Sequence, residues 1–275
     1  MIKNRKILLT GAAGGIGSQI AKVLASRGAN LILADIRQSL PDAMEKELAS
    51  TGAEFCYLCA NLSTKEGREI VKSFIEDKYG ELDILINCAG VNVFSLFEEI
   101  EEEDVESMIT VNITSPILLT RILLPLLKKA EHGHIINFGS IFGSIGYPGF
   151  SIYSATKFAI RGFTETLRRE LARTNLKVSY IAPRATRTGF NSNRVNDMNE
   201  ALGVKMDLPE VVASQLLSLI EKNMSTSQYL GWPEKLFVKI NSLFPKLVDR
   251  SLTGQLDTIS HYAHLKPAEI SRKTI

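Results

Sequence analysis

Short runs of apolar residues alternate along the chain with longer segments whose apolar positions recur every three or four residues. The short runs are rich in β-branched residues and predict six strands, over Lys6–Thr10, Asn30–Ala34, Glu54–Ala60, Asp83–Asn87, His134–Phe138 and Lys177–Ala182. The intervening segments predict helices over Gly17–Arg27, Pro41–Ser50, Lys65–Lys78, Glu102–Lys129, Ile152–Arg173 and Pro209–Asn223. This alternation predicts an α/β fold with a doubly wound parallel sheet between two layers of helices.

No repeat, low-complexity tract or linker divides the chain before about residue 225, so we expect one domain over residues 1–230 and a C-terminal helical extension over residues 231–275. In the extension, apolar residues recur at helical spacing beside cations, and Pro245 is expected to divide the helix. The apolar positions are Leu236, Phe237, Ile240, Leu243, Phe244, Leu247 and Val248, and the cations are Lys235, Lys239, Lys246 and Arg250. Such a segment can roof a pocket, pack on its own fold or a second subunit, or lie on a membrane; we favour packing over membrane contact.

Composition narrows the class of protein and of partner. Of the 275 residues, 45% are hydrophobic and 23% are charged, as is typical of a folded globular chain. The 32 Lys and Arg against 30 Asp and Glu leave a net charge of +2, which is too small for a surface that neutralises nucleic-acid phosphates. Three cysteines are too few for a disulfide framework, which indicates a reducing compartment, the cytoplasm.

We expect neither a secretory signal nor a transmembrane helix. The N-terminal residues run directly into the first predicted strand, and the longest apolar region, Ile113 to Leu127, is interrupted by polar residues and proline and is too short to cross a bilayer. A cytoplasmic protein is therefore predicted, with peripheral membrane contact through the extension as an open alternative.

A glycine-rich segment, Thr10-Gly11-Ala12-Ala13-Gly14-Gly15-Ile16-Gly17, joins the first predicted strand to the first helix. A turn at this place presents backbone N–H groups and a helix N-terminus to a pyrophosphate. Asp35 ends the second strand, eighteen residues after Gly17, where a carboxylate can accept hydrogen bonds from both adenosine ribose hydroxyls and repel a 2′-phosphate. Arg37 stands two residues further and weakens that preference, so NAD is expected and NADP is the alternative.

Residues 5 to 230 resemble the short-chain dehydrogenase/reductase family, on four features that occur in the family's order. These are the glycine-rich segment, the run Asn87-Cys88-Ala89-Gly90, Ser140 thirteen residues before Tyr153, and the run Tyr153-Ser154-Ala155-Thr156-Lys157. Asn112 lies in the preceding long helix, where the family keeps a fourth catalytic residue. The resemblance implies a Rossmann-type fold and a nicotinamide cofactor.

The resemblance also implies the site residues. The catalytic set is Asn112, Ser140, Tyr153 and Lys157. The cofactor-binding set is Thr10, Gly11, Gly15, Ile16, Gly17, Asp35, Asn61, Asn87, Ala89, Gly90, Tyr153, Lys157, Pro183, Thr186 and Thr188. By the same resemblance, Asn112 disturbs its helix locally and holds a water that relays protons to Lys157.

The chemistry needs these residue types for reasons that do not depend on the resemblance. A free tyrosine has a pKa of about 10 and is mostly protonated near neutrality, so a tyrosine base needs a group that stabilises its phenolate. Lys157 lies four residues after Tyr153, on the same helix face, and its ammonium favours the charged form. Ser140 can donate a hydrogen bond to the substrate oxygen as negative charge develops.

Two positions depart from the family pattern. Arg184 stands where the family has a glycine after Pro183, which puts the path of that loop, and the contacts of Thr186 and Thr188, in doubt. Asn61 stands where an adenine-contacting aspartate is common, and its amide can serve with altered pairing.

Cys56 and Cys59 have the spacing of a redox or zinc motif, but within a strand residues three apart point to opposite faces, so we interpret them as two buried thiols. The histidine pairs at 132 and 134 and at 261 and 264 have no third ligand nearby in the sequence. No metal site is expected.

A group of apolar side chains surrounds the predicted catalytic residues and favours a lipophilic substrate, although some of these side chains can instead pack in the core or on a partner subunit. They are Phe94, Phe97, Ile141, Phe142, Ile145, Tyr147, Phe150 and Phe190. The polar segment Gly189–Leu208 has the composition of a mobile lid.

The expected function is hydride transfer between a nicotinamide cofactor and the secondary alcohol or ketone of an apolar, lipid-, steroid- or retinoid-like substrate, in a homo-oligomer, either dimer or tetramer. One rival is a dinucleotide-binding sensor or scaffold without turnover, which has no need of a proton relay. The other is a sugar-nucleotide epimerase or dehydratase that retains its cofactor. The double glycine Gly14-Gly15 also fits that branch, but the run Asn87-Cys88-Ala89-Gly90 and the modest length argue against it.

Overall fold

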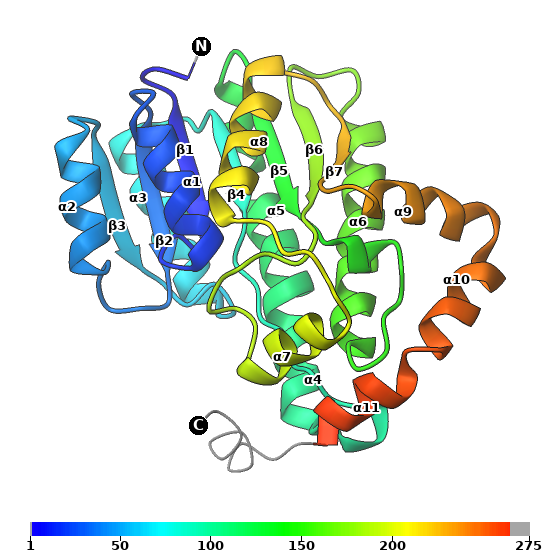
Figure 1. The fold of residues 1–275 in the computed structure, drawn as a ribbon. Coiled ribbons are helices and arrows are strands. Elements are labelled where there is room, and N and C mark those ends of the chain that lie inside the picture. Colours follow the sequence, from blue (N-terminus) through cyan, green and yellow to red (C-terminus); the bar gives the residue numbers. More distant parts are fainter. Residues whose placement is uncertain (1, 265–275) are drawn as a thin grey trace.

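Seven parallel strands form the centre of the computed structural model, which describes residues 2–264 (Figure 1). The strands are β1 (Lys6–Thr10), β2 (Asn30–Asp35), β3 (Phe55–Cys59), β4 (Ile84–Asn87), β5 (His134–Phe138), β6 (Lys177–Ala182) and β7 (Ser227–Tyr229). Their order in the sheet is β3-β2-β1-β4-β5-β6-β7. The chain therefore builds outward from β1 to β3 and then returns to the other side of β1, which leaves a crevice where the strand order reverses.

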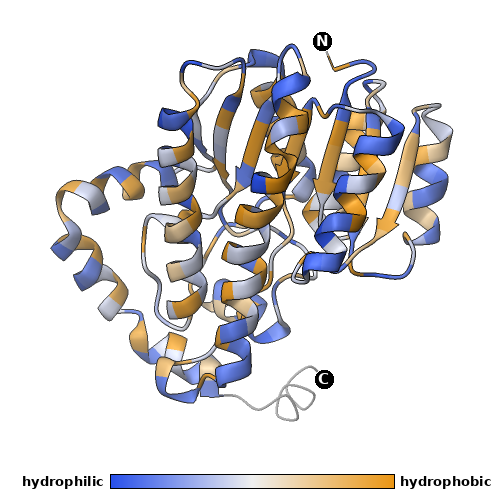
Figure 2. Cartoon of the chain, turned by 180° about the vertical axis from the view of Figure 1, so that it is seen from behind, coloured by the Kyte–Doolittle hydropathy of each residue, from blue (hydrophilic) through white to orange (hydrophobic). Residues whose placement is uncertain are grey.

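Helices cover both faces of the sheet because both faces of its strands are apolar. Ile7 and Leu9 pack with α1 (Gly15–Ala25), α2 (Asp42–Ser50) and α8 (Pro209–Lys222). Leu8, which points to the opposite face, packs with α3 (Lys65–Lys78), α5 (Ser115–Lys129) and α6 (Ser151–Glu170). Figure 2 shows the apolar strands enclosed between helices whose outer faces are polar. The predicted doubly wound, three-layer fold is confirmed.

The segment from residue 102 to 129 is one unbroken helical rod. It consists of α4 (Glu102–Ile109), a π-helical turn over Thr110–Thr114, and α5. Among residues 2–264 this is the one helix with the length and apolar composition to cross a membrane. Within the fold its apolar residues Leu119, Leu123 and Leu127 are fully buried against the sheet.

Three helices follow β7 and form what we call the arm, residues 232–264. They are α9 (Glu234–Leu243), α10 (Pro245–Thr253) and α11 (Leu256–His264). Figure 1 shows the arm curving away from the end of β7 and returning to the body beside α4 and α7 (Asn193–Ala201). Val238 of α9 packs with Ile141 and Ile145, and Ile259 of α11 is fully buried in a cluster that includes Phe94. As predicted, one helix ends before Pro245 and the next begins at it.

The structure adds two elements that the sequence did not predict in this part of the fold. The segment Gly189–Leu208, which we call the lid segment, contains a helix, α7, which Ser192 caps by accepting a hydrogen bond from the Val195 N–H at 3.4 Å. The inner side of α7 is buried through Val195 and Met198. The seventh strand, β7, was also not predicted, because its residues Ser-Gln-Tyr carry no apolar run.

The cysteine pair is not a pair of buried thiols. Cys56 is half-buried and Cys59 is exposed, because β3 is the edge strand of the sheet and one face of its end is open to solvent. Burial raises the pKa of the Cys56 thiol to about 11. Among the described residues there is no group of three or more His, Cys, Asp or Glu placed to hold a metal ion.

Candidate active site

A cleft of about 1010 Å³ opens at the carboxyl ends of the central strands, at the point where the strand order reverses. Every residue predicted to bind the cofactor lines this cleft, and so do Ser140, Tyr153 and Lys157. Asn112 does not line it; its side chain is buried behind the wall. The cleft has two parts. We call the part beside β1 and α1 the glycine-lined half, and the part that continues between α7 and the arm the apolar half.

Glycines in the turn between β1 and α1 let neighbouring segments approach the turn closely at the edge of the cleft. Gly11 has φ +66°, and a Cβ placed on it would lie 2.8 Å from the Cα of Ala89. A Cβ on Gly15 would lie 2.5 Å from the Cβ of Thr188, and one on Gly17 would overlap the carbonyl oxygen of Gly11. Because α1 begins at Gly15, its unpaired N–H groups face the cleft. The cradle therefore fits the pyrophosphate of a dinucleotide.

Asp35 lies at the far end of this cradle. Its Oδ2 accepts a hydrogen bond from the Ala13 N–H at 3.0 Å, and its Oδ1 accepts one from the Arg37 N–H at 3.2 Å. Each carboxylate oxygen keeps a lone pair for a further donor such as a ribose hydroxyl. The Arg37 guanidinium folds back onto the Ala13 carbonyl oxygen, so its charge lies beside the same corner of the cleft.

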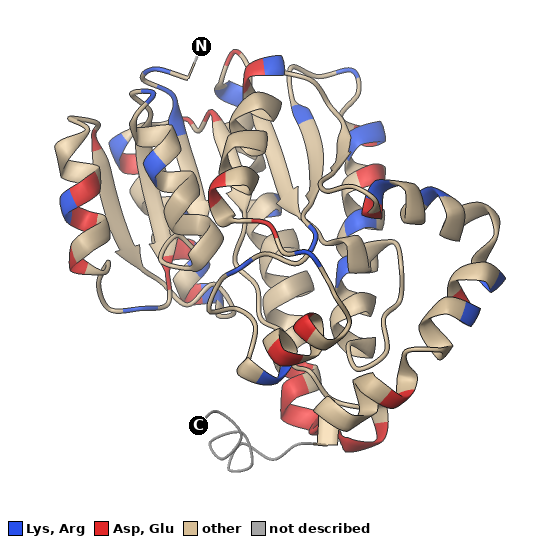
Figure 3. Ribbon diagram, in the orientation of Figure 1, with Lys and Arg blue, Asp and Glu red and all other residues tan. Residues whose placement is uncertain are grey.

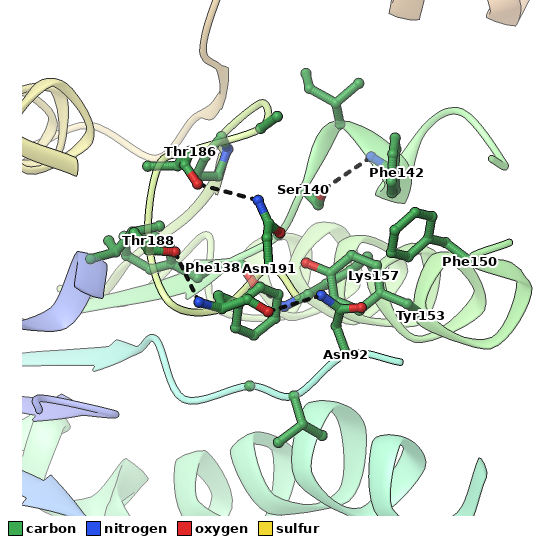
Figure 4. Close-up of a pocket in the computed structure, with 18 of the residues that line it drawn as sticks. Asn92, Phe138, Ser140, Phe142, Phe150, Tyr153, Lys157, Thr186, Thr188 and Asn191 are labelled. Carbon is green, nitrogen blue, oxygen red and sulfur yellow. Dashed lines mark hydrogen bonds between the residues drawn. The ribbon is translucent and has the colours of Figure 1, made fainter. Parts of the chain in front are cut away.

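Tyr153 is the central polar group of the inner cleft. It lies on α6 and is almost fully buried, and its ring is 6.0 Å from the ring of Phe190 and 6.4 Å from that of Phe142. Burial raises the pKa of the Tyr153 hydroxyl well above its usual value, although a hydrogen bond with the Ser140 side chain acts in the opposite direction. The hydroxyl is therefore held in its protonated form near neutral pH. Figure 4 shows Ser140 and Tyr153 facing the same cleft.

Ser140 is fixed by its surroundings at the end of β5. Its Oγ accepts a hydrogen bond from the Phe142 N–H at 3.1 Å, and its N–H donates to the Tyr180 hydroxyl at 3.3 Å. Tyr180 is fully buried and its hydroxyl donates back to the Ser140 carbonyl at 3.2 Å. These contacts hold the Ser140 backbone and its Oγ in place at the surface of the cleft.

Lys157 lies one helical turn after Tyr153 on α6, with its Nζ 5.5 Å from the centroid of the Tyr153 ring. Its Nζ donates a hydrogen bond to the Phe138 carbonyl at 3.1 Å. Burial lowers the pKa of this ammonium from 10.5 to about 8, so the group can lose and regain a proton in the physiological range.

Asn112 lies at the middle of the π-helical turn between α4 and α5. There the Ser115 N–H bonds to the Thr110 carbonyl, five residues back, and the Ser115 hydroxyl bonds to it as well at 2.8 Å. The Asn112 amide bonds to the 87–91 loop and α6: it accepts from the Val91 N–H at 2.9 Å and donates to the Val91 carbonyl at 2.8 Å and to Thr156 at 3.1 Å. One lone pair of its Oδ1 is left for a further donor.

Gly90 lies beside both the Asn112 side chain and the Lys157 amine. A Cβ on Gly90 would lie 3.3 Å from the Asn112 Oδ1 and 3.7 Å from the Lys157 Nζ. The two side chains therefore converge on one glycine, and any larger residue there would press between them.

Thr10 and Asn87 line the cleft but use their side chains on the protein itself. The Thr10 hydroxyl accepts hydrogen bonds from the N–H groups of Cys88 and Ala89 at 3.0 and 3.1 Å, which joins the end of β1 to the segment after β4. The Asn87 amide donates to Thr120 and Asn137 at 3.1 and 2.8 Å. Asn61 likewise accepts from the Ser63 N–H at 3.0 Å in the turn before α3. These side chains shape the walls of the glycine-lined half of the cleft.

Arg184 clamps three segments together. Its guanidinium forms ion pairs with Asp207 at 2.6 Å and with Glu234 at 3.2 Å, and it donates to the Trp232 carbonyl at 3.3 Å. All three charged side chains are largely buried. Gly231, with φ +90°, gives the space: a Cβ there would lie 2.5 Å from the Arg184 Cδ. The clamp joins the loop after β6, the end of the lid segment and the base of the arm.

The apolar half of the cleft has the predicted character, but its lining differs in part from the prediction. Six of the predicted residues line it: Ile141, Phe142, Ile145, Tyr147, Phe150 and Phe190. The other two do not. Phe94 is buried in a core cluster with Phe150 at a ring distance of 5.0 Å, and Phe97 is 72% exposed on a short 3₁₀ turn.

Sequence reasoning did not assign the other wall of this half. It is formed by the lid segment and the arm, through Val195, Met198, Leu202, Phe237, Ile240, Leu247, Val248 and Leu252. The apolar period of the extension was the signal available for the arm. For α7 the signal is weak, because its apolar residues are few among Asn, Asp and Glu.

A family model described as short chain dehydrogenase matches residues 5–199. A 3-oxoacyl-[acyl-carrier-protein] reductase of Thermotoga maritima is 30% identical over 84% of this chain and 96% of its own length. A diacetyl reductase [(S)-acetoin forming] of Staphylococcus epidermidis is 33% identical over 67% of this chain and 72% of its own length.

A solved structure has the same fold. The crystal structure of levodione reductase superimposes with a TM-score of 0.75 at 21% sequence identity, over 84% of this chain and 97% of that protein.

Proposed function

The chain belongs to the short-chain dehydrogenase family of NAD(P)-binding oxidoreductases, and from this premise we propose that it transfers a hydride between NAD(H) and the secondary alcohol or ketone of an apolar substrate. The observation that carries the proposal is the position of Tyr153, Ser140 and Lys157 where the glycine-lined half of the cleft meets its apolar half. In this proposal residues 1–230 bind the cofactor and hold the catalytic groups. The extension over residues 231–275 contributes a wall of the substrate site.

A bound nicotinamide dinucleotide would supply or accept the hydride at the substrate carbon. In ketone reduction the Ser140 hydroxyl donates a hydrogen bond to the carbonyl oxygen, and Tyr153 transfers its proton to that oxygen to give the alcohol. The raised pKa of Tyr153 supports this direction, because it keeps the proton available near neutral pH. The tyrosinate that remains is stabilised by the neighbouring Lys157 ammonium and regains its proton through it. Asn112 holds the 87–91 loop beside Lys157 and is proposed to position the water of that relay.

For the cofactor we propose NAD(H) over NADP(H), since the Asp35 carboxylate faces the end of the cradle where a 2′-phosphate would have to lie. Arg37 beside it supplies the charge that the alternative would use. Replacing Asp35 by Ser should raise KM for NADH about tenfold or more and improve the use of NADPH. Steady-state kinetics with both nucleotides measures this, with Arg37→Ala as the control that should weaken NADPH use alone. An unchanged preference in Asp35→Ser would contradict the assignment.

We also propose a homo-oligomer, a dimer or tetramer, in the cytoplasm. Ile109 and Phe158, on the adjacent helices α4 and α6, are 44% and 43% exposed, and such apolar side chains on neighbouring helices favour contact with a second subunit.

The direct test of the proposed activity is Tyr153→Phe, which removes one hydroxyl and keeps the ring. Ketone reduction should fall about 10²- to 10⁴-fold while NADH binding, followed by fluorescence titration, is unchanged. Tyr79→Phe is the matched control, because its hydroxyl bonds to Glu54 on the far side of the fold. Retained turnover in Tyr153→Phe would refute the assignment. Nucleotide binding without reduction of any ketone in a broad panel would favour the sensor, and cofactor retained through purification would favour the epimerase or dehydratase.

A further inference from the structure

The corner between α9 and α10 exposes large apolar side chains. Leu243 is 71% exposed, Phe244 60% and Leu247 58%, and Trp232 before α9 is 68% exposed. Of the sixteen large apolar side chains that are exposed among residues 2–264, seven lie between residues 232 and 256, so the exposure is concentrated here. These side chains form what we call the corner patch, together with Leu236, which is 40% exposed.

The corner patch is not needed to pack α9 on the fold. Val238 is the buried residue of α9, and Asn241, which lies on nearly the same side, donates to the Ser144 carbonyl at 2.9 Å. At 100° per residue, Leu236 and Leu243 lie on the opposite side of the helix. The apolar stripe of α9 is therefore wider than its contact with the body requires.

Cations flank the corner patch. Lys235, Lys239, Lys246 and Arg250 are all exposed on α9 and α10, and Figure 3 shows these basic positions along the two helices. Of the two acidic residues in these helices, Glu234 is paired with Arg184 and Asp249 is exposed. The pair of helices thus carries a net positive charge in a chain whose total is only +2. Apolar side chains between lysines, with tryptophan at the edge, are the pattern of a helix that lies in a membrane interface.

We propose that the corner patch docks on the surface of an anionic lipid bilayer. Docking would place the apolar half of the cleft next to the bilayer, so that substrate dissolved there can enter it. The apolar surface is continuous from the patch into the cleft, because Leu247 belongs to both and Phe237 and Ile240 of α9 line the cleft. The role in substrate delivery rests on the proposed function; the binding to lipid does not.

A second copy of this chain fits the corner patch less well. In a two-fold contact the same surface meets itself, which would bring the lysines and arginine of one arm against those of the other. Anionic headgroups complement these cations while the acyl region receives Leu243 and Phe244.

The first test measures binding of the intact protein, without nucleotide, to sedimenting phosphatidylcholine vesicles with and without phosphatidylglycerol. The protein should partition onto the anionic vesicles, and Leu243→Glu combined with Phe244→Glu should reduce this at least about tenfold. Neither residue lines the cleft. Ile70→Glu is the matched control, since Ile70 is 52% exposed on α3, and it should bind like the unaltered protein. Circular dichroism and NADH binding verify that all variants are folded.

The second test separates charge from apolarity. Lys239→Glu with Lys246→Glu should weaken partition onto anionic vesicles about tenfold or more, as should added salt, whereas Lys46→Glu with Lys65→Glu, on α2 and α3, should not. No partition by the unaltered protein, or partition that the corner variants leave unchanged, would overturn the proposal. So would a dimer in sedimentation velocity that the Leu243 and Phe244 variants dissociate, since the patch would then join two copies.

Turnover distinguishes this inference from the function it rests on. The corner variants should reduce diacetyl, a water-soluble ketone, at the normal rate but lose activity on a long-chain ketone presented in vesicles. Reduction of ketones without vesicle binding would refute docking on lipid and support hydride transfer. Vesicle binding by a protein that reduces no ketone would support docking and refute hydride transfer.

Discussion

Lys157 illustrates how a single residue sets function against stability. The residue is 6% exposed, and its Nζ donates a hydrogen bond to the Phe138 carbonyl. Removing a charged amine from water costs free energy, and the lowering of its pKa from 10.5 to about 8 expresses that cost. The fold tolerates the cost because the proposed chemistry needs a cation beside Tyr153.

Replacing Lys157 by Met should therefore stabilise the fold while abolishing turnover. Below pH 8 the amine is charged in both the folded and the unfolded chain, so the variant should gain about 1–3 kcal/mol in the free energy of unfolding. Between pH 8 and 10.5 the folded chain has released the proton that the unfolded chain still binds. The stability of the unaltered protein therefore rises with pH in this window, and the difference should shrink.

Urea unfolding at pH 7 and at two values within that window measures the difference. Lys65→Met, at an exposed position on α3, is the control and should change little. A gap that widened from pH 8 to 10.5 would contradict the assigned shift.

At the level of single residues the sequence predicted the lining of the cleft better through motifs than through apolar character. The residues assigned to the cofactor lie along the cleft because motif spacing ties them to strand ends, which topology brings together. Phe94 and Phe97 were misplaced because a phenylalanine near a strand end has no feature that separates lining from packing. Asn112 bonds to Val91 and Thr156, which lie 21 and 44 residues away in the chain. No local sequence pattern predicts those contacts.

Among the elements, the arm is joined to the rest of the fold at its base by Arg184. The ion pairs of Arg184 reach Asp207 in the lid segment and Glu234 in the first turn of α9. The arginine that interrupts the family's glycine motif is thus accommodated by a glycine elsewhere, Gly231, which supplies the missing space. Arg184, which replaces the glycine of the family pattern, therefore adds a contact with the arm and does not disturb the end of β6.

Replacing Arg184 by Gly should weaken the attachment of the arm and leave the proposed catalytic groups in place. Loss of both ion pairs leaves two largely buried carboxylates near each other, so the free energy of unfolding should fall by about 1–3 kcal/mol. KM for a long apolar ketone should rise about tenfold, while kcat for a short, water-soluble ketone should change little. Kinetics and thermal unfolding measure both effects, with Arg187→Gly, at an exposed position in the same loop, as control. A fall in kcat alone would assign Arg184 to the chemistry instead.

Element prediction succeeded where periodicity was strong and failed where pairing or packing decided the structure. The six apolar strands and the helices between them follow their hydrophobic pattern to within a few residues. β7 exists because Tyr180 and its neighbours in β6 offer backbone partners to Ser227–Tyr229, whatever their side chains. α7 exists because Ser192 caps it and α11 covers Val195, and neither effect is visible in a polar stretch.

For the whole molecule, the cleft joins two chemically different halves. The glycine-lined half belongs to the sheet and its first turn, and the apolar half is enclosed by the α6 side of the body, α7 and the arm. The family core and fold extend through the first half, whereas the arm lies beyond the region matched by the family model. Substrate preference is therefore expected to depend on parts that the shared motifs do not describe.

A homologous series of unbranched methyl ketones should reveal this apolar half. Each added methylene that leaves water contributes about 0.8 kcal/mol, so kcat/KM should rise about fourfold per carbon until the cleft is filled. Leu252→Asp, in the arm wall, should flatten the slope, and Leu243→Asp, outside the cleft, should not. The measurement is kcat/KM against chain length in detergent-free buffer. A flat series in the unaltered protein would indicate a small polar substrate, such as the one in the name of the staphylococcal relative.

The π-helical turn over Thr110–Thr114 has a consequence for how this rod tolerates length changes. The turn takes up one residue more than an α-helical turn, so deleting a single residue within it would let α4 and α5 fuse into one regular helix. Because the residue removed is the extra one, the helices on either side would keep their faces, with Met108 still buried and Leu119 still against the sheet. The carboxamide at 112 sits in the widened turn itself, so it would lose its hydrogen bonds with the 87–91 segment. A deletion elsewhere in α4 or α5 would instead rotate every residue before it by about 100° and bring the acidic face of α4 to the place of Met108. Length changes at the π-helical turn should therefore cost the proton path, and length changes beside it should cost the packing.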